Sequence, residues 1–463
     1  MANILITSIG NGTYDAEKKE HTYRPAKYVG AGKQDESGKQ DKKDKKDKKV
    51  VESAYVLDAL REIYTIDKCI LVGTAGSNWA AFYEHLFKSG RLNEMKEEYL
   101  LALLELSEQK EKHKLPPEDV RLQLEPLKQA MGQFCCAIIV LKYGLDDAEI
   151  LQNFALLSAV DNHIQNGNSI YFDITHSFRS LALYEYLAVS YLQNVLQKNV
   201  KLEFVSYGMF DFARENGGLA PIVDLSQLLR LTDWIKASEE YNRFGTAKLL
   251  AELLESDRIG LELSRESQKA LRRLGDPMIT SNLEEFRNLI KNCKGAVKQL
   301  DESQGQAQIV GYILRDLAQR FGDEALQNRP LMIARLARWH FEKARYIEAA
   351  ITLQEFLMNY CAELKGYNRE NFSEDQDIVF QRQLHRQLHS KTSNSVVGQF
   401  AERYLTFKDN YRNPLCHGKH LPEAERKGFA EFIKYFDSVY SRQFYQNPVN
   451  EEALRTLLGK ISV

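Results

Sequence analysis

The pattern that most constrains this fold is an alternation of short apolar, β-branched segments with amphipathic segments, which stops near residue 220. Strand character and helical periodicity follow one another about five times. This alternation is typical of a mostly parallel, doubly wound sheet covered by helices. The predicted strands are 3–9, 22–29, 69–74, 134–142, 169–174 and 201–207; the predicted helices are 52–64, one that opens at 79, two pieces within 92–131, 147–163 and 177–196.

From about residue 224 onward only helical periodicity remains. Two glycines and a proline within 217–221 mark the boundary. We therefore predict a Rossmann-like α/β domain with a mostly parallel sheet at 1–223, followed by an all-α half made of a connecting module, 224–330, and a further domain, 331–463. The helices expected in that half are 225–256, 261–273, 280–299, 305–321, 331–364, 377–389, 396–408 and 421–441.

Composition excludes several classes of protein. The net charge of −2 over 463 residues indicates that any nucleic-acid contact comes from a local patch, not from a basic surface. No apolar run reaches the roughly 18 residues that span a bilayer, and the N-terminus reads as a first strand, not a signal peptide. The six cysteines form no CxxC pair, so neither a zinc ribbon nor a disulfide framework is indicated. We expect a reduced, cytoplasmic protein without a membrane partner.

The segment Lys33 to Lys49 is dominated by Lys and Asp. Such a run cannot bury apolar surface, so we predict a solvated, disordered loop.

Polar loops with small residues follow three of the predicted strands, and the carboxyl ends of parallel strands share one edge of a sheet. Glycines allow a phosphate to approach the backbone, while hydroxyls and a guanidinium supply donors. We predict a phosphate and ribose pocket here, with Tyr207 and Gly208 at its rim. Its candidate residues are Ser8, Gly10, Asn11, Gly12, Gly73, Thr74, Gly76, Ser77, Asn78, Asp173, Thr175, His176, Ser177 and Arg179.

Two alternatives stay open at this first site. Each loop taken alone is also typical of an ordinary strand-to-helix turn in which Ser or Thr caps the helix. His176 is either a hydrogen-bonding pocket residue or a catalytic base. Neither a Gly-x-Gly-x-x-Gly loop nor a Walker lysine loop is present, which disfavours an ordinary dinucleotide or NTP site.

A second candidate site runs from Arg412 to His417. Asn413 followed by Pro414 predicts a helix that begins there, with its positive end near a bound phosphate. For RNA cleavage, an imidazole can move the protons and a guanidinium can stabilise the phosphorane charge without a metal. The alternative is a capped surface turn.

Two other histidine patterns resemble sites. Arg335 and His340 repeat the same spacing, but they lie within a periodic helix and are most simply an amphipathic helix face. His385 and His389 have the i,i+4 spacing that can hold zinc, but no third ligand accompanies them. We interpret that pair as an exposed helix face.

With these motifs in place, most of the chain resembles the CARF–HEPN ribonucleases that accompany type III CRISPR systems. Residues 173–180 are similar to the CARF signature, and 73–79 and the first strand loop support it. Residues 412–417 match the HEPN pattern of Arg, a polar residue and a following His, and 346–355 resemble the preceding HEPN helix.

The resemblance implies that 1–223 is a CARF-like domain that senses cyclic oligoadenylate, either cyclic tetra-adenylate or cyclic hexa-adenylate, and that 331–463 is a HEPN-like ribonuclease domain. The implied activity is a metal-independent endoribonuclease that cleaves single-stranded RNA in antiviral defence and needs no cofactor. Arg412, Asn413 and His417 would be its catalytic residues, completed in a homodimer or a higher assembly.

Two other functions are kept as alternatives. The chain is alternatively a non-enzymatic, cyclic-nucleotide-responsive regulator, although no recognition helix rich in Arg and Lys is evident. In the other alternative, the CARF-like domain itself degrades the cyclic activator, with His176 or a hydroxyl helping.

Overall fold

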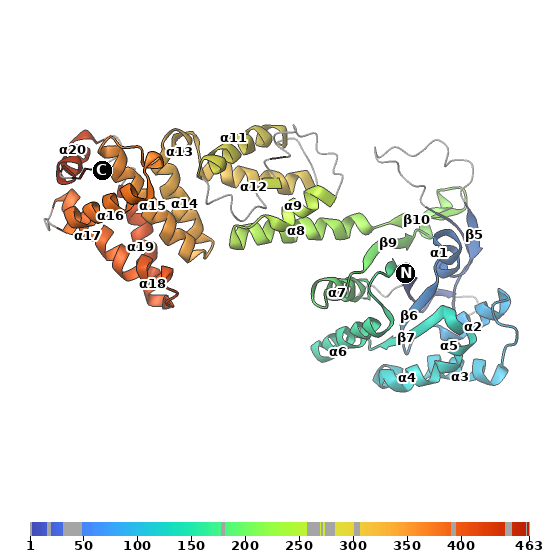
Figure 1. Ribbon diagram of the computed structural model, residues 1–463. Helices are drawn as coiled ribbons and strands as arrows, with labels where there is room; N and C mark the ends of the chain where they lie inside the picture. The colour runs from blue at the N-terminus through green and yellow to red at the C-terminus, as the bar shows by residue number, and fades with distance from the viewer. Residues whose placement is uncertain are drawn as a thin grey trace. The chain divides into compact units, whose positions relative to one another are not determined.

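The computed structural model describes residues 2–15, 20–30, 49–176, 181–256, 269, 272–273, 283–300, 306–389, 395–439, 447–459 and 461–462. The chain separates into two compact units, Met1–Arg230 and Leu231–Val463 (Figure 1). The predicted Lys33–Lys49 loop lies outside the described residues apart from its last residue. The predicted division of the all-α half into two domains stays a prediction.

A mixed eight-stranded sheet forms the centre of the first unit (Figure 1). In spatial order its strands are β5 (Val50–Ser53), β4 (Ala26–Gly30), β10 (Leu219–Asp224), β9 (Lys201–Gly208), β8 (Ser169–Asp173), β1 (Asn3–Ser8), β6 (Lys68–Thr74) and β7 (Cys135–Leu141). A separate antiparallel pair is formed by β2 (Thr13–Asp15) and β3 (Glu20–Thr22).

The strand order of the sheet reverses between β1 and β8. The five strands from β9 to β7 are parallel, whereas β10 is antiparallel to β9 and β5 is antiparallel to β4. After β1 the chain forms β4 and β5 at the far edge of the sheet, continues with β6 and β7 on one side of β1, and then returns to β8 on the other side of β1. Open α/β sheets leave a ligand crevice at the carboxyl ends of strands where the order reverses in this way.

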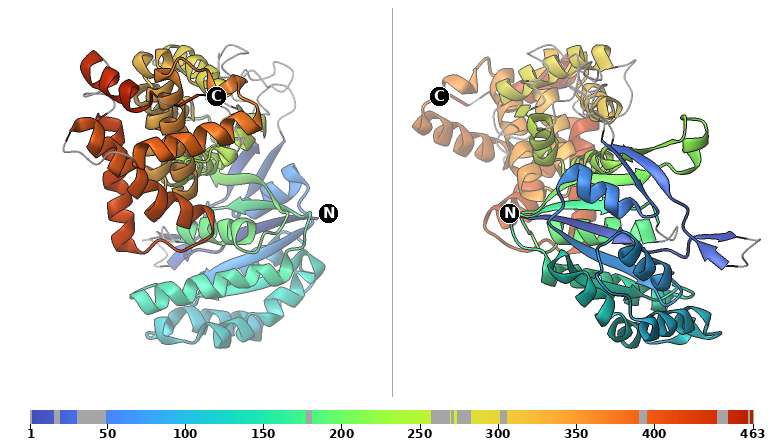
Figure 2. Two further views of the ribbon diagram at one scale, coloured as in Figure 1. Left: turned by 60° about the vertical axis from the view of Figure 1, so that its left-hand side comes forward. Right: turned by 90° about the vertical axis from the view of Figure 1, so that its right-hand side faces the viewer.

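Helices cover both faces of this sheet (Figure 2). One face packs against α1 (Val56–Tyr64), α2 (Trp79–Lys88), α3 (Glu97–Glu108), α4 (Pro117–Gln123) and α5 (Glu125–Ala130), and the other against α6 (Asp147–Ser158) and α7 (Leu181–Asn194). Successive residues of β1 alternate between the two cores, since Leu5 belongs to the first and Ile4 and Ile6 to the second. The predicted α/β fold is confirmed.

The described part of the second unit is helical (Figure 2). Its helices are α8 (Ser226–Phe244), which crosses the unit boundary, α9 (Lys248–Ser256), α11 (Leu283–Leu300), α12 (Gln306–Arg320), α13 (Asp323–Gln327), α14 (Arg329–Glu342), α15 (Tyr346–Leu364), α16 (Glu374–His389), α17 (Val396–Phe407), α18 (Asn413–Cys416), α19 (Glu423–Val439) and α20 (Pro448–Leu457). One continuous apolar core runs from Trp234 to Ile461. The predicted all-α half is confirmed for the described residues.

Several element boundaries differ from the prediction. The helix expected at 52–64 begins only at Val56, because β5 occupies the preceding residues. The helix expected at 331–364 is two helices, since Ala344 adopts the left-handed conformation, with φ of 57°, between α14 and α15. Strand β10 was not predicted, because Pro221 argues against a strand within a sheet. Pro221 lies opposite Val29 within the ladder with β4 and directly before the ladder with β9, which covers Ile222 to Asp224.

Candidate functional site

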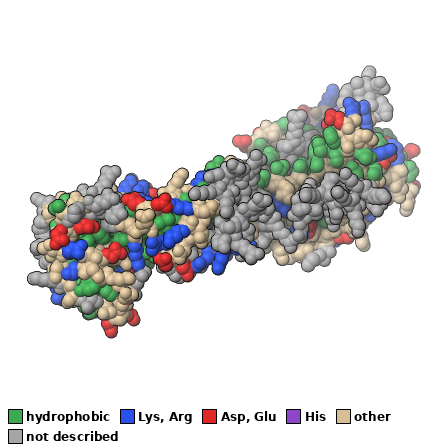
Figure 3. Space-filling model, turned by 90° about the horizontal axis from the view of Figure 1, so that it is seen from above, with side chains coloured by type: hydrophobic (Ala, Val, Ile, Leu, Met, Phe, Trp, Pro, Cys, Tyr) green, Lys and Arg blue, Asp and Glu red, His purple; other side chains and the backbone are tan. Residues whose placement is uncertain are grey.

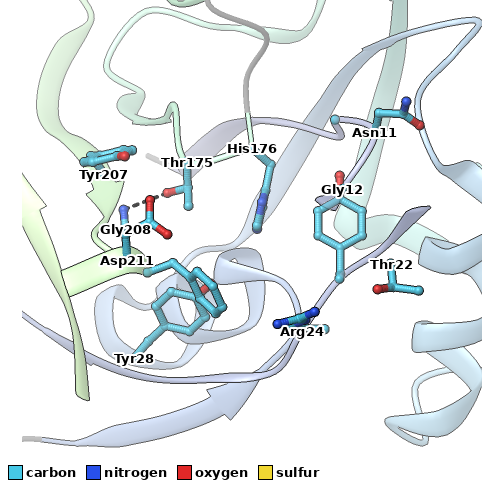
Figure 4. A pocket seen from close by; sticks show the side chains of 14 residues that line it. Asn11, Gly12, Thr22, Arg24, Tyr28, Thr175, His176, Tyr207, Gly208 and Asp211 are labelled. Carbon is cyan, nitrogen blue, oxygen red and sulfur yellow. Dashed lines mark hydrogen bonds between the residues drawn. The ribbon is translucent and has the colours of Figure 1, made fainter. Parts of the chain in front are cut away.

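A cavity of about 370 Å³ opens at the switch point of the sheet (Figure 4). Its walls come from the loops that follow β1, β8 and β9, joined by the segment between β3 and β4. The lining residues are Gly10, Asn11, Gly12, Thr22, Tyr23, Arg24, Tyr28, Ala54, Thr175, His176, Tyr207, Gly208, Phe210 and Asp211. Of the three loops predicted to converge, those after β1 and β8 line this cavity, with Tyr207 and Gly208 beside them, whereas the loop at 73–78 does not; the role of these residues in ligand binding stays a prediction.

Asp173, at the end of β8, holds the loop that follows this strand through hydrogen bonds of its carboxylate. Its carboxylate is fully buried and accepts hydrogen bonds from the hydroxyls of Thr7 (2.7 Å), Thr175 (2.5 Å) and Ser206 (3.3 Å). The Thr175 hydroxyl in turn accepts from the backbone N–H of Gly208 at 2.8 Å (Figure 4). The carboxylate thus holds the β8 and β9 loops together, and its oxygens point into the protein.

The β1 loop passes close to the β8 loop, which requires glycine at position 10. A Cβ atom there would lie 2.4 Å from the carbonyl oxygen of His176, a backbone atom that cannot move aside cheaply. The carbonyl of Gly10 accepts from the backbone N–H of Asn78 at 2.8 Å, so the β6 loop is tied to the same edge. Gly12 has a φ of +79°, which disfavours any residue with a side chain.

His176 lies among aromatic rings at the cavity wall. Its Nε2 accepts a long hydrogen bond, 3.5 Å, from the backbone N–H of Val56 at the start of α1, and its ring contacts Tyr23 edge-on at 5.0 Å. Burial lowers the pKa of His176, and the negative charge of Asp173 opposes this shift without cancelling it. The imidazole is therefore neutral at pH 7, with its Nε2 lone pair directed at the Val56 amide.

The phenols of Tyr23 and Tyr28 remain protonated, because burial raises the pKa of both groups above the usual value. Together with Arg24 they supply donors to the cavity, whereas Asp211 supplies acceptors. Tyr207 and Phe210 are each 38% exposed and offer aromatic surface. The cavity thus combines donors, one carboxylate and exposed rings, a set suited to a nucleotide with its phosphate.

The predicted site residues divide into three groups. Gly10, Asn11, Gly12, Thr175 and His176 line the cavity. The other described candidates do not line it; they are Ser8, Gly73, Thr74, Gly76, Ser77, Asn78 and Asp173. The third group, Ser177 and Arg179, lies outside the described residues.

The β6 loop mostly closes on itself. The Ser77 hydroxyl accepts from the Thr74 backbone N–H at 2.9 Å, the Thr74 hydroxyl accepts from the Gly76 N–H at 3.2 Å, and Asn78 caps α2 by accepting from Ala81 at 3.1 Å. Ligand contact by this loop stays a prediction. Its described contacts are those of the ordinary strand-to-helix turn that was kept as the alternative.

Sequence reasoning missed the cavity residues that come from β3 and β4, the segment between them, the residue after β5 and the segment after β9. These are Thr22, Tyr23, Arg24, Tyr28, Ala54, Phe210 and Asp211. Strand β4 reaches the site only because it pairs with β10, about 190 residues later. No local signal in the sequence indicates that pairing.

The second candidate site differs from its predicted geometry. Residues Lys408–Arg412 form a π-helical turn that joins α17 to α18, and Asn413 has helical dihedrals, φ −64° and ψ −48°. The predicted N-cap at Asn413 is therefore wrong, because α18 begins at Asn413 but continues the helical path of α17 through the π turn. Pro414 lacks an N–H and its ring crowds the carbonyl four residues earlier, which the wider π turn accommodates. With no free helix N-terminus here, the argument from the helix dipole is withdrawn.

The three polar residues of this motif nevertheless lie close along one helical path. The Asn413 side-chain oxygen accepts from Arg412 Nη1 at 3.0 Å, and Asn413 and His417 are four residues apart, which places them on one face. His417 is exposed and ends α18; Gly418, with φ +71°, follows it in the left-handed conformation typical of a helix C-terminus.

Beneath the motif, buried polar groups hold the helices in place. Gln354 on α15 donates to the Tyr404 hydroxyl at 3.0 Å, and both side chains are buried. Arg412 is close enough to Tyr404 to lower the pKa of its phenol, although burial outweighs that effect and raises it. Arg412 is thus half-buried against α15 and α17, while His417 faces solvent.

The two other histidine patterns lie in different surroundings. His340 is 1% exposed within the core and Arg335 pairs with Glu324 at 3.0 Å, so this second Arg–His spacing is structural. His385 and His389 stack edge to face at 4.5 Å on α16. Among the described residues, no group of three or more His, Cys, Asp or Glu side chains could hold a metal ion.

Comparison with known proteins assigns the first unit to a class. Residues 4–210 match the family model of the CARF domain of the CRISPR system endoribonuclease Csx1. Residues 4–210 of the N-terminal unit are therefore similar to a CARF domain. Residues 230–327 match the model of the second domain of the CRISPR-associated protein MJ1674. The chain is accordingly related to CRISPR-associated CARF proteins.

One relative is this CRISPR-associated protein MJ1674 from Methanocaldococcus jannaschii, which is 28% identical over 445 residues. The match covers 92% of this chain and 63% of the relative's length. The solved structure of Enterococcus italicus Csm6 bound to cyclic hexa-2'-fluoro-hexa-dAMP aligns over 99% of both chains, with 11% identity and a TM-score of 0.31. A similarity that low carries no argument about this chain.

The described helices include none that is both long and apolar enough to cross a bilayer. On the face seen in Figure 3, basic and acidic side chains are interspersed, in keeping with the net charge of −2.

Proposed function

We propose that this chain is an endoribonuclease that cleaves single-stranded RNA when its CARF domain binds cyclic oligoadenylate, as part of type III CRISPR antiviral defence. The observation that carries the proposal is the cavity at the switch point of the sheet, within the segment that matches the CARF domain. The matched family model is the CARF domain of a CRISPR system endoribonuclease, which supports the catalytic part.

The chemistry of the cavity suits a cyclic oligoadenylate. Tyr207 and Phe210 offer rings on which adenines can stack, and Arg24 and the Gly10–Gly12 backbone can contact phosphates. The volume of about 370 Å³ is at the low end of the roughly 300–1,000 Å³ of small-molecule sites. One copy would hold part of the ring, and two copies related by a two-fold axis would hold the rest.

Cleavage would occur at Arg412, Asn413 and His417. The 2′-oxygen of the RNA attacks the adjacent phosphorus, the bond from phosphorus to the 5′-oxygen breaks, and a 2′,3′-cyclic phosphate and a 5′-hydroxyl form. One imidazole takes the 2′-OH proton and another protonates the 5′-oxygen, so His417 from two copies would fill both roles. Asn413 would orient the Arg412 guanidinium, which stabilises the negative charge of the phosphorane. No step requires a metal or a cofactor.

Activation requires that the cyclic ligand bind the cleaving arrangement of the protein more tightly than the resting one, because a ligand without that preference shifts no equilibrium.

The test is cleavage of a fluorogenic single-stranded RNA by purified protein in EDTA, with and without cyclic tetra-adenylate or cyclic hexa-adenylate. We expect cleavage only with an activator and none from the His417→Ala variant, which should still bind the ligand. His420→Ala is the matched control, because His420 is an exposed histidine three residues away. Full activity of His417→Ala would refute the catalytic assignment.

Two further outcomes separate the alternatives. Ligand binding without any RNA cleavage would favour the non-enzymatic regulator. Loss of the cyclic ligand that survives His417→Ala would favour degradation by the CARF domain.

A further inference from the structure

A groove in the second unit has the composition of a single-stranded RNA site, away from the residues assigned to catalysis. It encloses about 890 Å³ between α12, α14, α17 and α19. Its walls are two helix faces with the same spacing. Arg335, Arg338, Trp339 and Glu342 line it from α14, and Glu431, Lys434, Tyr435 and Ser438 line it from α19.

Positions i, i+3, i+4 and i+7 share one face of a helix. Both walls follow that spacing, and α14 and α19 pack against each other. The groove is therefore built from two facing stripes on rigid helices and does not depend on loop conformation.

Two arginines of the groove, Arg320 and Arg338, form ion pairs with carboxylates. Glu342 accepts from Arg320 at 2.5 Å and from Arg338 at 2.9 Å, and Arg338 also reaches Asp437 on α19 at 3.0 Å. Burial alone raises the pKa of Glu342, but these two arginines outweigh burial and lower it. The carboxylate stays charged, so these arginines are fixed and largely neutralised.

Two cations at the groove are not neutralised in this way. Arg403 on α17 and Lys434 on α19 are exposed and form no ion pair with a described residue. The Arg403 guanidinium lies 4.3 Å from the ring centre of Tyr435. A guanidinium held over an aromatic ring offers a flat surface on which a base can stack, and a nearby ammonium can contact the backbone phosphate.

We propose that this groove binds the substrate RNA strand outside the catalytic motif, with Arg403 and Tyr435 as the base platform and Lys434 on the phosphate. The inference rests on the proposed ribonuclease function and adds a substrate site that lies outside Arg412–His417. Arg403 lies on α17, nine residues before Arg412, which ends the π turn that follows this helix. A double helix would not fit, because its bases are stacked on one another and cannot reach the platform.

The test is fluorescence anisotropy of a labelled single-stranded RNA, measured in the His417→Ala background so that the RNA stays intact. The Arg403→Ala/Lys434→Ala variant should weaken binding about ten-fold or more. Losing Lys434, the cation assigned to the phosphate, should also reduce the slope of log Kd against log salt by about 0.7, the value for one phosphate contact on a single strand.

The matched control is Lys291→Ala/Arg382→Ala, which removes the same charge from exposed positions on α11 and α16, outside the groove. A groove variant with the Kd and salt slope of this control would overturn the proposal. Equal loss of binding to duplex and single-stranded RNA would also overturn it, because the platform requires unstacked bases.

These results are independent of the catalytic proposal. If wild-type protein never cleaves RNA but the groove variant loses RNA binding, the groove stands and the ribonuclease function fails. If wild-type protein cleaves RNA and the groove variant binds it normally, only the groove fails.

Discussion

Replacing His340 with leucine should remove much of the acid sensitivity of the second unit. His340 is 1% exposed, and burial, with a smaller effect of the Arg345 charge, lowers the pKa of its imidazole to about 3. In the unfolded chain the same group titrates near 6.5. Below pH 6.5 the unfolded state therefore binds a proton that the folded state excludes, and folding stability falls as pH falls.

The size of the effect follows from the two pKa values. One pKa unit corresponds to about 1.4 kcal/mol. Between pH 8 and pH 5 this one group should cost about 2 kcal/mol of unfolding free energy, and the full loss by pH 3 approaches about 5 kcal/mol. His340→Leu should abolish that component while other titrating groups contribute equally to both proteins.

Urea denaturation followed by tryptophan fluorescence measures the difference. In a Trp79→Phe background the signal comes only from Trp234 and Trp339, both in the second unit. The loss of unfolding free energy from pH 8 to pH 5 should be about 2 kcal/mol smaller in His340→Leu than in the parent. Parallel pH profiles would refute the reasoning, and His420→Leu, at an exposed position, should give such a parallel profile.

Two changes in the first unit test the cavity. Gly10→Ala should raise the half-activating concentration of cyclic tetra-adenylate about ten-fold or more, because its Cβ would meet the His176 carbonyl at 2.4 Å; Gly295→Ala, whose Cβ meets nothing within 4 Å, should not, and an unchanged titration for Gly10→Ala would contradict the pocket. Thr175→Val removes the acceptor of the Gly208 N–H and should destabilise the first unit by about 1–3 kcal/mol in thermal or urea unfolding, whereas Thr175→Ser should restore stability; equal stability of the two variants would show that this bond is unimportant.

Local sequence patterns were sufficient for the parallel centre of the sheet. Its strands are apolar and β-branched, and polar loops end them, so both the strands and the shared edge could be predicted. Strands β5 and β10 were not predicted, and the predicted strand 22–29 overlaps β4, whose pairing with β10 joins residues about 190 positions apart. For that reason Tyr23 and Arg24, just before β4, were not predicted to line the cavity.

At the motif from Arg412 to His417, the residue types were informative but the local geometry was not. Asn413 followed by Pro414 has the signature of a helix start, yet the same proline is accommodated by a π turn inside a continuing helix. Burial likewise distinguishes His340 from His417, although both follow an arginine at the same spacing. Burial depends on tertiary packing, which a spacing rule does not contain.

The π turn at Lys408–Arg412 determines the direction in which the side chains of α18 and of His417 leave the helix axis. A regular α-helix advances about 100° per residue, whereas a π turn advances less, so the turn rotates α18 about the helix axis relative to α17. The direction in which His417 emerges therefore depends on Pro414 as much as on the number of residues that separate it from Arg412. A chain that kept the spacing but lost the proline could close the wide turn and present the imidazole on a different side.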